Sequence, residues 1–92
     1  MKKSILKNII KEAISDMEVS LKLSNGKIIH GKARKNPKAL SLQIGSNTYF
    51  YFWEGKFIKS GTGGKTAVTI VEGVDDYSYG WFLTAKEEYL AA

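Results

Sequence analysis

A glycine-rich run at residues 60–66, SGTGGKT, is the first part of the chain whose residue types could perform chemistry. A phosphate-binding loop has a glycine, four residues and then Gly-Lys-Ser/Thr, so that its amides surround the phosphates before a helix begins. Here Lys59 occupies the position of the first glycine, and the residues after Thr66, AVTIVEG, are rich in β-branched residues and predict a strand. We therefore predict a connection between strands, in which Lys59 and Lys65 could contact a partner, and no nucleotide site.

Catalytic and metal-binding residue sets are sparse. His30 is the only histidine and the chain has no cysteine, so a zinc site would need mostly carboxylates, and a histidine base would lack a recognisable nucleophile. Glu72, Asp75 and Asp76 could hold a hard cation or form a solvated turn, and the turn is the simpler reading. We predict a protein that is not an enzyme, with no cofactor, no metal and no small-molecule substrate.

Aromatic side chains give a stronger signal. Tyr49, Tyr51 and Trp53 share one face of a predicted strand, TYFYFW, and the same spacing returns further along the chain in a second predicted strand, YSYGWFL. Such rings can stack on the bases of single-stranded nucleic acid while Lys and Arg follow the backbone. They can equally form the layer on which a helix packs, or anchor a protein partner.

Positive charge is concentrated in the first two thirds of the chain. Residues 1–65 hold thirteen of the fourteen Lys and Arg residues against four carboxylates, a net charge of +9, whereas residues 66–92 have a net charge of −4. This asymmetry favours a polyanionic partner on one side of the molecule, although lysine is also a common solubilising residue.

The length of 92 residues predicts a single domain, 1–92, and an apolar fraction of 43% argues against disorder. The first residues, MKKSILKNIIKEAISD, begin like a signal peptide, but Lys7, Lys11 and Glu12 interrupt the apolar stretch. We therefore expect a cytoplasmic protein with no membrane span.

The elements that must position these residues follow from the hydrophobic pattern. Residues 4–16 predict an amphipathic helix, and MEVSLKLSNGKIIHGKAR alternates as a hairpin around Asn25-Gly26. A two-residue turn would set His30 across from Leu21 and mix charge into the apolar face. A three-residue turn instead sets Ile29, Gly31 and Ala33 across from Leu21, Val19 and Met17, and we prefer this register.

Further strands are predicted around residues 40–44 and 48–53, with Phe50 and Phe52 facing Leu42 and Leu40. Shorter strands follow around 57–58, 66–72 and 77–83, and Thr84 with Glu87 predicts a capping box for a short final helix. The predicted fold class is α+β: an N-terminal amphipathic helix packed on an antiparallel five- to six-stranded meander or small, partly open barrel, with a short C-terminal helix.

Residues 19–31, VSLKLSNGKIIHG, resemble the opening hairpin of Sm-like RNA-binding barrels, a group within the SH3-like small β-barrels. Those proteins also place a helix before a strand, an Asn-Gly turn, and a second glycine five residues after the first, here Gly26 and Gly31. The resemblance covers about a third of the chain and implies a small barrel. The family's nucleotide-pocket residues are absent, because Pro37, Ala39 and Ser41 stand at the corresponding positions, so it implies neither the uridine pocket nor the ring assembly.

Two function classes follow. The first, slightly favoured because the positive charge is concentrated, is a small nucleic-acid-binding module with a basic face and stacking aromatics. The second is a protein-binding inhibitor or adaptor, of the type made by phages or mobile elements, that acts on host machinery. The predicted nucleic-acid-binding residues are Lys3, Lys7, Lys11, Lys22, His30, Lys32, Arg34, Lys35, Lys38, Tyr49, Tyr51 and Trp53.

Overall fold

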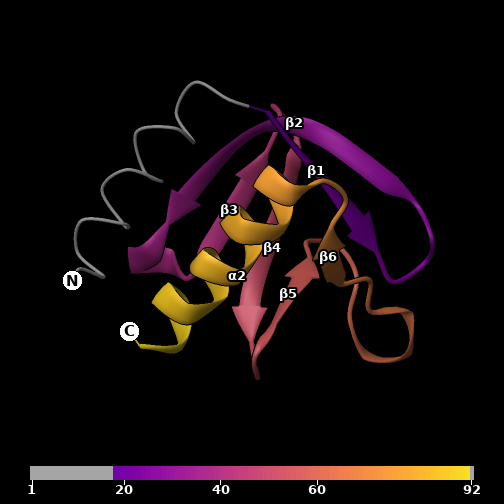
Figure 1. Ribbon diagram of the computed structural model, residues 1–92. Helices are drawn as coiled ribbons and strands as arrows, with labels where there is room; N and C mark the ends of the chain where they lie inside the picture. The colour runs from indigo at the N-terminus through magenta and orange to yellow at the C-terminus, as the bar shows by residue number, and fades with distance from the viewer. Residues whose placement is uncertain (1–17, 92) are drawn as a thin grey trace.

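The computed structural model describes residues 18–91, which form six strands and one α-helix (Figure 1). Two 3-10 turns, η1 (Pro37–Ala39) and η2 (Gly64–Thr66), lie in the connections. The strands are β1 (Glu18–Leu23), β2 (Ile28–Asn36), β3 (Ser41–Ile44), β4 (Thr48–Trp53), β5 (Lys56–Lys59) and β6 (Ile70–Gly73), and the helix is α2 (Asp76–Leu90).

The strands form one curled antiparallel sheet in the order β5-β4-β3-β2-β1-β6. An isolated bridge between Ile58 and Thr69 joins β5 to the segment before β6, and the amide of Lys59 donates to the carbonyl of Val68 at 2.7 Å. The two edges of the sheet thus approach each other, and the sheet is a nearly closed barrel. This shape is compatible with the small SH3-like barrel that the resemblance implies.

The β1–β2 hairpin has the predicted register. Leu21 pairs with Ile29 and Val19 pairs with Gly31, so the apolar side chains share the inner face. The turn closes with the Leu23 amide donating to the Lys27 carbonyl at 2.8 Å, and Gly26 has the left-handed φ of 88° that the three-residue turn requires. The predicted partner of Ala33, Met17, lies outside the described residues.

The β3–β4 pairing is also as predicted, since Leu42 faces Phe50. Alternation along β4 then buries Phe50 completely and turns Tyr49, Tyr51 and Trp53 to the opposite, outer face. At the far end of this pair, the Phe52 amide donates to the carbonyl of Leu40 at 2.7 Å.

The prediction of the helices in the fold class was wrong. The segment YSYGWFL, predicted as a strand, is the first half of the fifteen-residue helix α2. Asp75 is its N-cap, and Thr84, predicted to begin a short helix, lies in its middle with its hydroxyl donating to the carbonyl of Gly80 at 2.9 Å. The buried positions of the helix recur at spacings of three and four residues, the period of an α-helix: Ser78, Trp81, Phe82, Ala85 and Tyr89.

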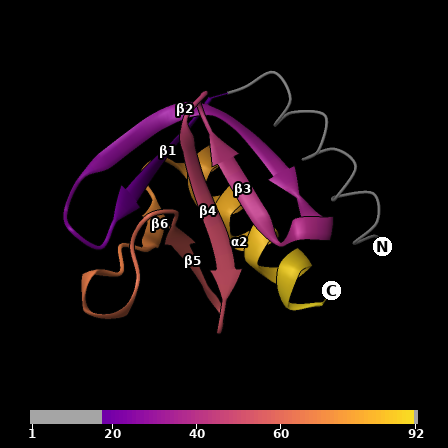
Figure 2. The ribbon, with the colours of Figure 1, turned by 180° about the vertical axis from the view of Figure 1, so that it is seen from behind.

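Helix α2 fills the concave side of the barrel. It crosses in front of the sheet in Figure 1 and lies behind β3 and β4 in Figure 2, and its buried side chains join those of the strands in one core. The end of β6 touches the helix so closely that a Cβ on Gly73 would lie 2.2 Å from the Ser78 and Tyr79 backbone. The described residues thus place a C-terminal helix on the sheet; the N-terminal helix predicted at residues 4–16 lies outside them.

Candidate nucleic-acid interface

On the outer face of the sheet, strand β4 carries a line of exposed aromatic rings. Tyr49, Tyr51 and Trp53, hereafter the aromatic stripe, have exposed fractions of 40%, 49% and 67%. They are exposed because β4 uses its other face, with Phe50, for the core, and because α2 covers that inner face. Figure 2 looks onto the strands from this outer side.

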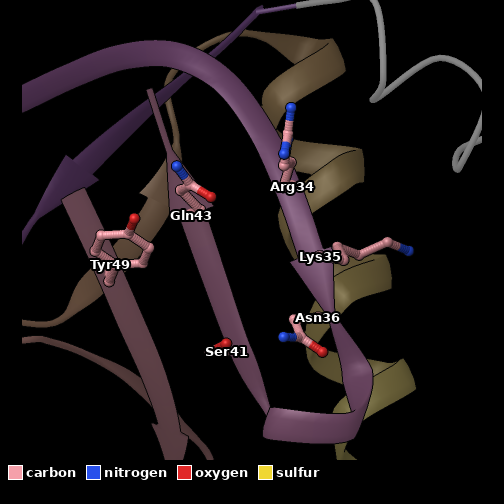
Figure 3. A pocket seen from close by; sticks show the side chains of 6 residues that line it. All are labelled: Arg34, Lys35, Asn36, Ser41, Gln43 and Tyr49. Atoms are coloured by element: carbon pink, nitrogen blue, oxygen red, sulfur yellow. The ribbon is translucent and has the colours of Figure 1, made fainter. Parts of the chain in front are cut away.

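One cross-strand row of the outer face combines three different functional groups. Arg34 on β2 faces Gln43 on β3, and Gln43 faces Tyr49 on β4. The row borders a shallow groove of about 270 Å³, which Asn36 and Ser41 also line (Figure 3). A cation, a neutral amide and an aromatic ring therefore follow one another across three adjacent strands.

The amide of Gln43 has a defined orientation. Its Nε2 donates to the carbonyl of Gly45 at 3.2 Å and, more weakly, to that of Ser46 at 3.4 Å. Both partners are acceptors, so the nitrogen must face the β3–β4 turn, and the Oε1 faces away from it. Gln43 is not among the site residues predicted from the sequence, although the predicted pairing of Leu42 with Phe50 implies that Gln43 lies opposite Tyr49.

The buried Tyr89 hydrogen-bonds to the backbone of two residues that line the groove. The Tyr89 phenol donates to the Ser41 carbonyl at 2.5 Å and accepts the Asn36 amide at 3.0 Å, which ties α2 to the ends of β2 and β3. Burial raises the pKa of Tyr89 to about 12, so the phenol keeps its proton at neutral pH. The Asn36 side chain is also engaged, because its Oδ1 accepts the Ala39 amide of η1 at 3.4 Å.

Lys35 lies apart from the other predicted cations. It belongs to the inward row of β2, and in Figure 3 its side chain extends away from Arg34 and Gln43. Its Nζ pairs with the Glu88 carboxylate at 2.5 Å, and the Lys35 side chain is only 3% exposed. Lys35 is among the residues that line the groove, but its side chain pairs with Glu88 and joins β2 to α2.

The remaining cations of β1 and β2 differ in their neighbours. Lys32 faces Glu18 across the hairpin, and Lys22 faces Glu72 of β6. Arg34, by contrast, faces the neutral Gln43. Lys38 is exposed on η1, beyond the end of β2, and Lys3, Lys7 and Lys11 lie outside the described residues.

His30 is exposed on the outer face of the hairpin, where its Nδ1 and the Ser20 hydroxyl are 2.7 Å apart.

The carboxyl of Asp75 has a pKa below its usual range, mainly because it accepts the backbone N–H of Ser78 at 2.8 Å. The Ser78 hydroxyl and the charge of His30 lower it further. Asp75 is therefore a helix cap.

The glycine-rich run uses its own backbone groups. The amides of Thr62, Thr66 and Ala67 donate to carbonyls within the run or next to it, and the Thr66 hydroxyl donates to Gly63 at 2.9 Å. Only the short 3-10 turn η2 lies there, and β6 follows it. Lys65 is exposed and Lys59 is half-buried at the end of β5, so the run is a connection between strands and lacks the helix of a phosphate-binding loop.

Within residues 18–91, no group of three or more His, Asp or Glu side chains is placed to hold a metal ion. Over the same residues, no helix has the length and apolar character to cross a membrane. No protein-family model matches the chain, and no curated protein or solved structure matches it.

Proposed function

We propose that the protein binds single-stranded nucleic acid on the outer face of β2, β3 and β4. The observation that carries the proposal is the exposure of the aromatic stripe beside Arg34, whose partner across the β2–β3 pairing is the neutral Gln43. The rings of the stripe do not contribute to the core, because β4 already buries Phe50 on its inner face.

The spacing of the rings suits an extended strand of nucleotides. Alternate residues of a β-strand lie about 7 Å apart, so bases on successive rings of the stripe would be separated from one another and each would stack on protein. Stacking of this kind contributes about 1–3 kcal/mol per base and tolerates any base, because every base has an aromatic face. Arg34 and the exposed Lys32 and Lys38 supply positive charge for the phosphates.

Fluorescence anisotropy of a labelled single-stranded oligonucleotide, measured at low and at moderate salt, tests the proposal. We expect binding that weakens with salt, because each neutralised phosphate releases counterions, and that weakens further in Arg34→Ala. Tyr79→Ala, which removes an exposed tyrosine from α2, is the control and should bind as the unaltered protein does. Absence of binding at low salt would refute the proposal.

Protein binding is the second candidate, and it rests on a different surface. Tyr79, Leu83 and Leu90 lie on one face of α2 with exposed fractions of 51%, 41% and 63%. Exposed apolar side chains in a row are typical of helix-mediated contacts, as expected of an inhibitor or adaptor. Leu83→Lys should abolish capture of a protein partner if this surface is used, and should leave oligonucleotide binding unchanged.

A further inference from the structure

We infer that the nucleic acid preferred by the outer face is RNA, and that Gln43 distinguishes ribose from deoxyribose. The inference rests on the proposed function, since it concerns the same surface. It starts from the row in which Tyr49, Gln43 and Arg34 occupy directly paired positions on three adjacent strands (Figure 3).

The order of groups in this row matches the order of groups in a nucleotide. A base stacks on a ring and a phosphate pairs with a guanidinium, so a nucleotide spanning Tyr49 and Arg34 places its sugar between them. Neighbouring strands are about 4.8 Å apart, and the strand between those two residues is β3. The side chain that β3 presents at this position is Gln43, which lines the groove together with both partners.

Gln43 presents an acceptor to that sugar. Its Nε2 is directed to the carbonyls of Gly45 and Ser46, and within residues 18–91 its Oε1 accepts no hydrogen bond. The other amide of the groove is less suitable, because the Oδ1 of Asn36 accepts the Ala39 amide. Gln43 is thus the neutral acceptor available in the middle of the row.

A 2′-hydroxyl can donate to such an acceptor, and deoxyribose has no group in its place. With DNA, the Oε1 of Gln43 would face a C–H group beneath the bound strand and would lose its water without gaining a partner. The arrangement therefore favours RNA through a single hydrogen bond, made by the one nucleotide that spans this row. One such bond corresponds to an affinity ratio of about two- to tenfold.

Three labelled oligonucleotides of one length test the inference: oligouridylate, oligodeoxyuridylate and the 2′-fluoro form of oligouridylate. All three carry the same base. The 2′-fluoro form keeps the sugar pucker of RNA but cannot donate a hydrogen bond. We expect the full-length protein to bind oligouridylate about two- to tenfold more tightly than either of the others.

Gln43→Leu should bring the three affinities together, because it removes the hydrogen bond to oligouridylate and also the desolvation penalty that Gln43 imposes on oligodeoxyuridylate. Asn47→Leu adds the same side chain at an exposed site in the adjacent turn and should preserve the preference. Thermal unfolding of both variants establishes that they fold, and the 2′-fluoro comparison requires no variant.

The outcomes separate the two proposals. Equal affinity for the three oligonucleotides would overturn the sugar preference and leave nucleic-acid binding intact. A preference that persists in Gln43→Leu, or that the 2′-fluoro form shares with RNA, would overturn the role of Gln43. Absence of binding to all three would overturn the proposed function and the inference with it.

Discussion

The same five-residue spacing, Tyr-x-Tyr-x-Trp, occurs twice in this chain with opposite results. In β4 it is Tyr49, Tyr51 and Trp53, and all three rings are exposed on one face. In α2 the corresponding tryptophan, Trp81, is 1% exposed and belongs to the core, whereas Tyr79 is 51% exposed. A strand repeats every two residues and a helix every 3.6, so the strand gathers such a motif on one face and the helix distributes it.

The context of each motif decides which structure it adopts. TYFYFW places apolar rings between the motif residues, and the β3–β4 pairing gives those rings a place in the core. YSYGWFL is preceded by Asp75, whose carboxylate caps Ser78, and is followed by Ala85 and Tyr89 at helical spacing. The lesson is that caps and distant periodic partners outweigh a local alternation of rings.

The largest expected effect is a difference in the free energy of unfolding between variants of the two tryptophans. Trp81→Ala should lower the free energy of unfolding by about 3–5 kcal/mol, because it leaves a cavity between α2 and the sheet. Trp53→Ala should change it by no more than about 0.5 kcal/mol, since that ring is mostly in solvent. Urea unfolding followed by far-UV circular dichroism measures both, and similar losses in the two variants would contradict the assignment of faces.

The next effect separates two neighbouring cations of β2. Lys35→Met should destabilise the protein by up to about 3 kcal/mol, because it leaves Glu88 at the junction with α2 without its partner. Oligonucleotide affinity at a temperature where the variant is folded should stay nearly unchanged. Arg34→Ala should do the reverse: little change in unfolding midpoint and a smaller salt dependence of binding.

A smaller effect compares two exposed tyrosines. Tyr49→Ala should lose about 1–3 kcal/mol of binding free energy for a single-stranded oligonucleotide, since it removes one stacking surface. Tyr79→Ala, with a similar exposed fraction in the other motif, should lose none. Anisotropy titrations of the two variants side by side give the comparison, and equal losses would place the interface elsewhere.

The smallest effect concerns the cap that makes the second motif helical. The pKa of Asp75 is lowered on folding, so its contribution to stability is present above the unfolded value of 3.8 and is lost as the pH falls through the lower folded value. Asp75→Asn, which keeps an acceptor at the N-cap, should remove this pH dependence while nearly retaining the melting temperature at pH 7. Melting temperatures of Asp75→Asn and of the unaltered protein, each measured at pH 7 and near pH 3, test this prediction.

Sequence analysis could predict the parts of the fold in which local signals agree. The Asn25-Gly26 turn and the burial of Val19 and Leu21 are sufficient to define the hairpin register. The alternation of β4 placed Tyr49, Tyr51 and Trp53 on one face but left open whether that face is exposed or covered by a helix. The prediction failed at α2, because the alternation of Tyr77, Tyr79 and Trp81 indicated a strand and Asp75 was interpreted as part of a turn, whereas it is the N-cap of the helix.

The site was only partly predictable for a similar reason. Tyr49 and Arg34 could be selected by residue type, but the importance of Gln43 comes from its position between them, which depends on two strand pairings at once. The inward direction of Lys35 was hidden because β2 alternates charged residues on both faces near its end, and Glu88 is 53 residues away in sequence.

Intrinsic tryptophan fluorescence gives the most direct test of the outer face as the binding surface, because Trp53 is exposed and Trp81 is buried. Titration with a single-stranded oligonucleotide should quench the emission to a saturable limit, as bases stack on Trp53. In Trp53→Phe, where Trp81 alone emits, the same titration should leave the emission unchanged even though the oligonucleotide still binds by anisotropy. Binding without quenching in the unaltered protein, or quenching that persists in Trp53→Phe, would contradict the account.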